Sequence, residues 1–195
     1  MFFNKFIISL ILIVSTVLTF KGSVSESASV VITEKSTLLI NGKSNVNSFS
    51  CVYDIEKIKN PIRVHYAVED NTINFEQTTL FLETTCFDCG GNGINRDFRK
   101  TLNTDDYPEI ALSLKAVELK PQGASLNAYI DIKIAGISRL YTIPIKLKKK
   151  GNIMISGDLK LKLSDFNLKA PNKLFGIISV EDTIEIVFNL ELEKQ

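Results

Sequence analysis

The sequence of 195 residues has no tryptophan, two methionines, three cysteines and a single histidine, His65. Most histidine-dependent hydrolytic mechanisms would therefore depend on that one residue. No charge of one sign dominates, because 23 Lys and Arg stand against 22 Asp and Glu. The balance gives no indication of a nucleic-acid partner, which requires a clustered basic face. The proportions of apolar (45%) and charged (23%) residues are those of a globular protein and exclude a disordered or multi-span membrane chain.

The N-terminus has the pattern of a secretory signal peptide. One positive charge in Met1–Lys5 precedes an unbroken run of apolar, Ser and Thr residues over Phe6–Phe20, and small polar residues follow. A retained membrane anchor is the alternative, but a spanning helix needs about 20 apolar residues. A bacterial lipoprotein would require a cysteine directly after the run, and none is present there. We expect a signal peptide over 1–25, a periplasmic or secreted protein with no stable membrane span, and one domain over 26–195.

Export would place the three cysteines where disulfides persist. Cys86 and Cys89 have the C-x-x-C spacing of a redox motif, a small disulfide ring or half a zinc site. No βαβ pattern surrounds them, and only Cys51 and His65 could complete four zinc ligands. We expect a Cys86–Cys89 disulfide or two loop thiols, with Cys51 as a buried thiol. No motif indicates a metal ion or a cofactor.

From Val30 onward the hydrophobic pattern has a period of two. In residues 126–134 the even positions are apolar, and Asn127, Asp131 and Lys133 lie between them. Successive strand side chains point to opposite faces, so such a strand has one dry face and one wet face. The same alternation recurs over 49–56, 110–115, 141–147, 159–163 and 184–192. It predicts an antiparallel all-β domain of roughly eight to ten strands, as a barrel or a sandwich.

Turn and helix signals interrupt this pattern at a few places. Lys150–Asn152 predicts a hairpin turn, and Pro144 indicates a sheet edge or a bulge. Gly90–Gly93 lacks the Lys-Ser/Thr of a phosphate-binding loop and is interpreted as a flexible loop. The one short helix or turn is expected at Asn95–Leu102.

Five segments in order resemble the YceI-like family. They correspond to its opening hairpin, its Arg-Asp segment with the Tyr-Pro-x-Ile strand that follows, its Gly-Val-Thr-Lys/Arg element and its two closing strands: Ile40–Phe49, Asn95–Leu102 with Tyr107–Leu112, Ile134–Arg139, Leu163–Phe166 and Val180–Ile186. The resemblance extends over about Val31–Leu192. It implies a single antiparallel up-and-down, lipocalin-like β-barrel of about eight strands with one short helix or turn.

The resemblance also implies an exported lipid-binding protein, not an enzyme, that holds an apolar polyisoprenoid or isoprenoid quinone inside the barrel. Burial of such a chain gains about 0.8 kcal/mol per methylene. Phe81 and Phe175 are further aromatic candidates for the cavity wall. The barrel-lining candidates are Phe49, Tyr53, Phe75, Leu112, Leu114, Ile130, Ile132, Ile143, Leu161, Phe166 and Phe188.

Polar candidates lie near the expected helix. Arg96, Asp97 and Arg99 could form a clasp at the barrel mouth that touches a ligand head group. Alternatively, Asp97 caps the helix and the arginines are solvated or pair with nearby carboxylates. No nucleophile accompanies His65, so we interpret it as an ordinary strand residue.

Two other functions stay open. The barrel could be the scaffold of a protein-interaction module that binds through the unusual loop Cys86–Gly93. A thiol-redox protein acting through Cys86 and Cys89 is the third class, and it would require a reachable, stabilised thiolate. A homodimer is also compatible with the sequence, whereas a nucleic-acid partner is not expected.

Overall fold

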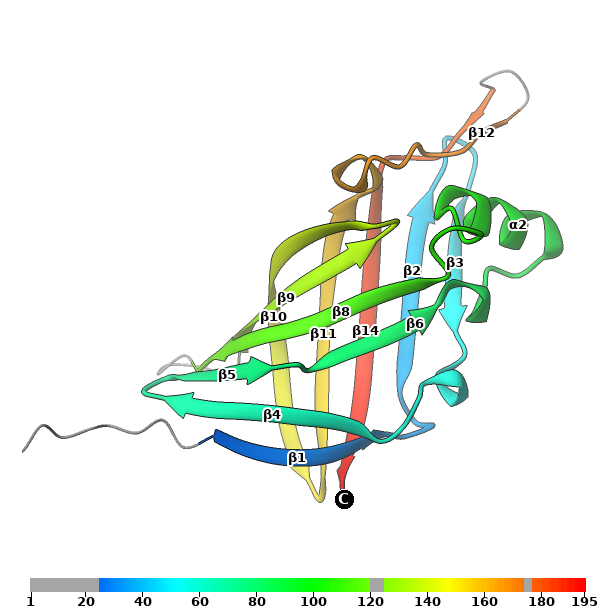
Figure 1. The fold of residues 1–195 in the computed structure, drawn as a ribbon. Helices are drawn as coiled ribbons and strands as arrows, with labels where there is room; N and C mark the ends of the chain where they lie inside the picture. Colours follow the sequence, from blue (N-terminus) through cyan, green and yellow to red (C-terminus); the bar gives the residue numbers. More distant parts are fainter. Residues whose placement is uncertain (1–24, 120–124, 174–176) are drawn as a thin grey trace, which may run out of the picture.

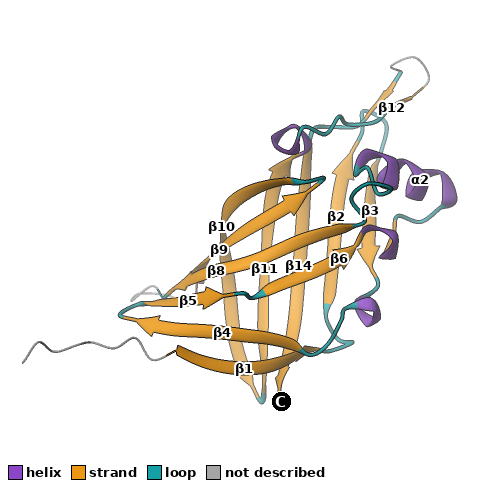
Figure 2. Cartoon of the chain, viewed as in Figure 1, coloured by secondary structure: helices purple, strands orange, loops and turns teal. Residues whose placement is uncertain are grey.

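The computed structural model describes residues 25–119, 125–173 and 177–195, and most of these lie in antiparallel strands (Figures 1 and 2). The predicted export signal lies almost entirely outside the described residues, and so does Phe175. The longer strands are β1 (Ser25–Ile32), β2 (Thr37–Lys43), β3 (Ser48–Tyr53), β4 (Ile62–Glu69), β5 (Thr72–Glu76), β6 (Thr79–Glu83), β8 (Glu109–Glu118), β9 (Ser125–Ile134), β10 (Ile137–Lys150), β11 (Asn152–Lys162) and β14 (Thr183–Lys194).

Short elements connect these strands. The helix α2 (Asn92–Thr101) precedes β8, and it follows the two-residue strand β7 (Phe87–Asp88). The remaining elements are the 3-10 turns η1 (Ile55–Lys57), η2 (Thr84–Cys86) and η3 (Leu163–Phe166), with the small hairpin β12 (Asn172–Lys173) and β13 (Ile178–Ser179).

Eight strands form a closed ring in the order β1-β4-β5-β8-β9-β10-β11-β14. The ring closes because β1 pairs with β14 over Val30↔Lys194 to Ile32↔Leu192. All the pairings are antiparallel, and neighbouring strands of the ring succeed one another in the order in which they occur along the chain. This confirms the predicted lipocalin-like barrel. The sandwich alternative is wrong because the pairing of β1 with β14 closes these eight strands into one ring.

Two of the ring strands change partners along their length. The C-terminal part of β14 pairs with β1, whereas Glu185–Asn189 pairs with β2. In the same way, β8 pairs with β5 near its C-terminus and with β6 over Glu109–Ser113. Two further pairings, β2 with β3 and β3 with β7, complete the sheet near α2. The end of the barrel that carries α2 is therefore built from β2, β3, β6 and β7, and the far end from β1, β4 and β5.

The fork in β14 is closed by one buried hydroxyl. Glu191 lies between the residues that pair with β2 and those that pair with β1, and its N–H donates to the Ser36 Oγ at 2.9 Å. The Thr33 N–H donates to the Glu191 carbonyl oxygen at 2.9 Å. Ser36 is only 4% exposed, so its hydroxyl replaces water as the partner of this amide. Hydrogen bonding along β14 thus continues across the fork.

The structure confirms the predicted turn and helix but not the predicted role of Pro144. The turn at Lys150–Asn152 is confirmed, with Gly151 at φ 74°. Pro144 does not mark an edge strand, because β10 pairs with both β9 and β11, although the β10–β11 pairing stops at Ile145, beside the proline. The helix is confirmed but begins earlier than expected. Its first residues are Asn92 and Gly93, which belong to the segment that we expected to be a flexible loop.

Candidate functional site

The barrel encloses a cavity of about 660 Å³. That volume lies within the range of ligand pockets, roughly 300–1,000 Å³. The inner faces of the strands supply its wall: β9 contributes its five even positions from Leu126 to Ile134, and β14 its five from Ile184 to Leu192. Five alternate positions on one strand extend over about 26 Å. The cavity is therefore long, and it follows the barrel from one end to the other.

Most of the predicted lining residues lie on this wall. They come from both halves of the chain and from six different strands: Phe49, Phe75, Leu112, Leu114, Ile130, Ile132, Ile143 and Phe188. A glycine opposite accommodates the ring of Phe188, because a Cβ on Gly157 would lie 2.8 Å from its Cζ. Phe49 in the same way lies across Gly42, its partner on β2.

Three predicted lining residues are buried but do not line the cavity: Tyr53, Leu161 and Phe166. Tyr53 packs edge-on against Phe87, with ring centroids 4.9 Å apart, and Phe166 stacks on Tyr141 at 6.3 Å. Alternation identifies the inner face of a strand, but it does not say how far along the barrel the open space extends. Phe81 points outward and is 49% exposed, since its neighbours Leu80 and Leu82 occupy the inner face of β6.

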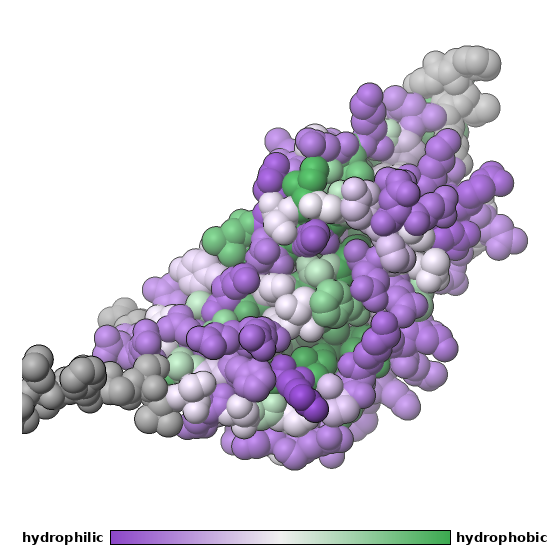
Figure 3. Space-filling view, in the orientation of Figure 1, coloured by the Kyte–Doolittle hydropathy of each residue, from purple (hydrophilic) through white to green (hydrophobic). Residues whose placement is uncertain are grey.

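The wall is apolar apart from five residues: Ser44, Asn47, Thr78, Asp97 and Thr101. No lysine, arginine or histidine lies on the described part of this wall. Figure 3 shows apolar side chains in a recess near the middle of the visible face, bordered by hydrophilic residues. Such a surface suits an apolar ligand and offers few polar contacts.

The face of helix α2 that lines the cavity carries both apolar and polar side chains. The lining residues of α2 and of its C-cap, Leu102, are spaced as neighbours on one side of a helix: Ile94, Asp97, Phe98, Thr101 and Leu102. Arg96 is exposed and Arg99 half-buried, and neither lines the cavity. The predicted polar clasp is therefore reduced to Asp97. The alternative role of Asp97 as a helix cap is wrong, because α2 begins at Asn92 and Gly91 is the N-cap.

The disulfide joins Cys51 to Cys89, and Cys86 is free. Our expectation of a Cys86–Cys89 pair with a free Cys51 was wrong, and strand register explains why. β3 pairs with β7 through Val52↔Asp88 and Tyr53↔Phe87, so the next residues, Cys51 and Cys89, lie opposite each other. Cys86 is an odd number of positions from Cys89 and is not carried to the same face.

Asp88 and Asn95 position α2, although neither side chain was predicted to have a role. Asn95 Nδ2 and the Gly90 N–H both donate to Asp88 Oδ1, at 2.9 and 3.0 Å. The Asn95 Oδ1 in turn accepts from the Cys89 N–H at 2.6 Å. The hydrogen bond from Asn95, followed by that from Gly90, lowers the pKa of Asp88. These contacts connect the disulfide directly to the first turns of α2.

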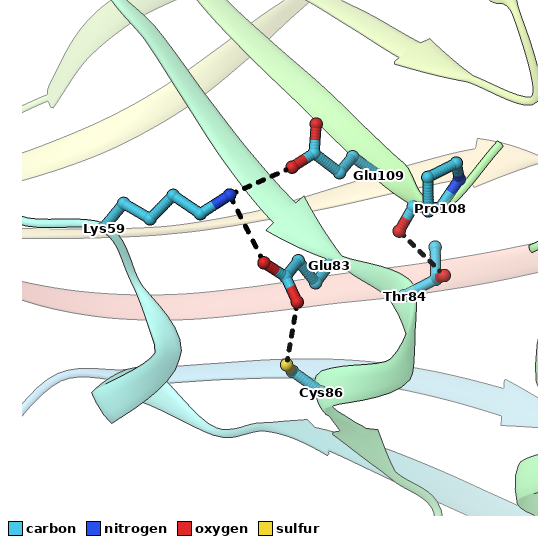
Figure 4. Close-up of polar contacts among 6 residues, drawn as sticks. All are labelled: Lys59, Glu83, Thr84, Cys86, Pro108 and Glu109. Atoms are coloured by element: carbon cyan, nitrogen blue, oxygen red, sulfur yellow. Dashed lines mark hydrogen bonds and ion pairs between the residues drawn. The ribbon is translucent and has the colours of Figure 1, made fainter.

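A polar cluster lies beside the free thiol (Figure 4). Lys59 Nζ lies 3.3 Å from Glu83 Oε1 and 3.4 Å from Glu109 Oε1, and the hydrogen bond to Glu83 contributes most to the raised pKa of Lys59. The Cys86 Sγ lies 3.9 Å from the other Glu83 oxygen. Reactive thiols are typically found beside positive groups, whereas the nearest charge here is a carboxylate.

The other residues considered for chemistry are dispersed. His65 lies on β4, and its Nδ1 is 2.9 Å from the Ser27 Oγ of β1. No cysteine is among the hydrogen-bond partners given for His65. Across the described ranges, no group of three or more His, Cys, Asp or Glu side chains is arranged to hold a metal ion. None of the described helices is long and apolar enough to span a membrane.

An antiparallel β-barrel with a long apolar lumen defines a lipocalin-like class of protein. Solved structures specify the type further: the chain has a YceI-like fold. BcnA of Burkholderia cenocepacia superposes with a TM-score of 0.63 at 18% identity, over 84% of this chain and 99% of that one. A polyisoprenoid-binding domain from Saccharophagus degradans superposes at 0.58 with 12% identity, over 87% and 100%.

A mutant YceI protein of Campylobacter jejuni, with a monobromobimane guest, superposes at a TM-score of 0.52 and 15% identity, over 62% of this chain and 73% of that one. No family model matches the sequence, and no curated protein matches it significantly. At these identities the solved structures establish the fold.

Proposed function

We propose that this protein is an exported carrier that binds one apolar molecule, of the polyisoprenoid or isoprenoid-quinone class, inside the barrel and does not act as an enzyme. The observation that carries the proposal is the barrel cavity of about 660 Å³ with its almost entirely apolar wall. A protein with the same fold is described as a polyisoprenoid-binding domain, which supports this ligand class.

The energetics favour a long apolar ligand over a small polar one. Each methylene moved from water into such a lumen gains about 0.8 kcal/mol, so affinity grows with chain length and needs few directional contacts. A cavity about 26 Å long, by the strand rise along β14, suits an extended chain. The apolar wall would otherwise face water or empty space inside the barrel.

Export is supported by two features of the chain. The first is the signal-peptide pattern of residues 1–25, and the second is the Cys51–Cys89 disulfide, which persists in an oxidising compartment. N-terminal sequencing of the protein recovered from the periplasm or medium should begin close to Ser25. Recovery of the uncleaved chain from the cytoplasm would contradict export.

Native mass spectrometry of the purified mature protein tests the binding proposal. We expect a mass increment that organic extraction removes and that identifies an apolar compound. Ile186→Trp places a large side chain on the cavity wall and should abolish the increment. The control is Leu140→Trp, which adds the same group at a position that is 65% exposed. A protein that is empty when purified and takes up no added isoprenoid alcohol would overturn the proposal.

A further inference from the structure

We propose that the hairpin turn between β10 and β11 docks on the surface of a membrane that contains anionic phospholipids, which brings this end of the lumen wall against the bilayer. The basic turn is defined here as residues 146–154, and it lies at the end of the barrel opposite α2 (Figure 1). The docking goes beyond the proposed function, and only its value for reaching a membrane-dissolved ligand rests on that function.

The first argument is the charge of the basic turn. It carries four lysines, Lys146 and Lys148–Lys150, and no Asp or Glu occurs in the sequence between Asp131 and Asp158. The whole chain is close to neutral, so the run is a local concentration of positive charge. Each lysine held close to an anionic lipid surface adds to the attraction.

The lysines of the basic turn are available to a partner. Glu191, on the neighbouring strand β14, accepts a hydrogen bond from Asn152 Nδ2 at 2.7 Å and lies 3.8 Å from Lys35 Nζ. The other acid at this end of β14, Glu193, is exposed and is followed by Lys194. Three lysines are exposed, and no ion pair joins them to any residue that the structure describes: Lys146, Lys148 and Lys149.

The second argument is the apolar surface among these lysines. Met154, on the outer face, is 44% exposed, and Leu147, on the inner face, is 45% exposed. Along the inner face of β10, Ile143, Ile145 and Leu147 all line the cavity, and the first two are buried. The lumen wall therefore reaches the surface at the basic turn. Apolar side chains set among lysines are typical of a segment that lies in the interface of a membrane.

Lysines near a strand end can also protect an unpaired edge from aggregation. That role needs only their charge, and it does not account for two large apolar side chains exposed beside them.

The α2 end of the barrel is the weaker candidate for docking. It too has an exposed lining residue, Val46. However, residues 92–106, which include α2, carry three basic and three acidic side chains, so their charges cancel: Arg96, Arg99 and Lys100 against Asp97, Asp105 and Asp106. The basic turn is thus the end that an anionic surface attracts.

Sedimentation of the mature protein with lipid vesicles tests the proposal. Vesicles of phosphatidylglycerol and phosphatidylcholine in equal parts are compared with vesicles of phosphatidylcholine alone. We expect sedimentation with the anionic vesicles in physiological salt, little with the uncharged ones, and release from the anionic vesicles at about 0.5 M salt, where charges are screened.

The variant combines Lys146→Gln, Lys148→Gln and Lys149→Gln, and it should bind the anionic vesicles on the order of a hundredfold more weakly. The matched control removes the same charge from exposed lysines far from the basic turn and should bind as the wild type does: Lys43→Gln, Lys100→Gln and Lys162→Gln. None of these six lysines lines the cavity, so both triple variants should keep the thermal midpoint and the bound ligand of the wild type.

Several results would overturn the docking. They are wild-type binding to neither kind of vesicle, equal binding to both kinds, and equal losses in the two triple variants. Binding to polyglutamate without binding to vesicles would also overturn it, and would indicate an acidic protein partner instead. Native mass spectrometry of the same samples separates this proposal from the proposed function. A protein that sediments but neither carries nor takes up an apolar ligand contradicts the function alone, and a ligand-bound protein that does not sediment contradicts the docking alone.

Discussion

Two regions of the molecule surround the same cavity but are held in different ways. The wall, formed by the ring strands, consists of long ladders in which every second side chain points inward. The cap, defined here as residues 86–101, has a two-residue strand, one helix and few ladder hydrogen bonds. Its position depends on the Cys51–Cys89 disulfide and on the hydrogen bonds between Asp88 and Asn95.

The difference shows how each region responds to change. In the wall, many similar ladder hydrogen bonds and apolar contacts hold the strands in place. We therefore expect a single apolar substitution to enlarge or fill the lumen without altering the topology. In the cap a few specific contacts determine the position of the Asp97 side of the cavity. The wall therefore supplies most of the apolar lining of the cavity, and the cap supplies Asp97 and Thr101, two of its five polar lining residues.

The largest effect is expected at the disulfide. Cys89→Ser should lower the free energy of unfolding by about 2–5 kcal/mol, because the bond closes a loop with a sequence separation of 38 residues. Thermal unfolding with and without reductant would measure it. Cys86→Ser is the matched control and should leave the thermal midpoint unchanged, since Cys86 is free. Equal losses in both variants would show that the cap does not depend on this bond.

The wall is tested by two adjacent residues of β9. Ile132 is 2% exposed and lines the cavity, whereas Lys133 is exposed on the outer face. Ile132→Ala should cost about 2–4 kcal/mol, and Lys133→Ala less than about 0.5 kcal/mol. Denaturant unfolding compares the two variants. Similar losses would mean that the alternation does not separate inside from outside on this strand.

Where wall and cap meet, burial, followed by the nearby Cys86, raises the pKa of Tyr53 to about 12. The unfolded chain releases this proton near pH 10 and the folded chain near pH 12, so the stability from the protonated form is complete below pH 10 and lost between these values. The full loss is on the order of 2–3 kcal/mol. Tyr53→Phe should flatten the pH dependence of unfolding across this window, and an unchanged slope would contradict the assignment.

The smallest effect is expected at the exposed ion-pair cluster of Lys59, which lies outside the cap, beside Cys86. Lys59 contacts Glu83 and Glu109, yet its side chain is 72% exposed, so the attraction is screened by solvent. Lys59→Met should leave the thermal midpoint unchanged in physiological salt. A clear drop would show that this cluster, and not the disulfide alone, holds the segment beside Cys86.

The same contrast explains what the sequence could and could not predict. The wall was predictable because a period of two places Ile130, Ile132 and Phe188 on an inner face whatever the neighbouring strands are. The cap was not, because the partner of Cys51 depends on the pairing of β3 with β7, segments far apart in the chain. The extent of the cavity was also beyond reach, so Leu161 and Phe166 were assigned to it although they pack elsewhere.

The fork in β14 has a consequence for how such a barrel can vary. The strand β14 passes from its partner β2 to its partner β1 without interrupting its hydrogen bonds. The β2–β3 hairpin therefore enlarges the sheet at one end of the barrel only. Residues added to or removed from the β2–β3 hairpin would therefore alter the part of the cavity wall formed by Ser44, Val46 and Asn47 and leave the pairing of β1 with β14 unchanged.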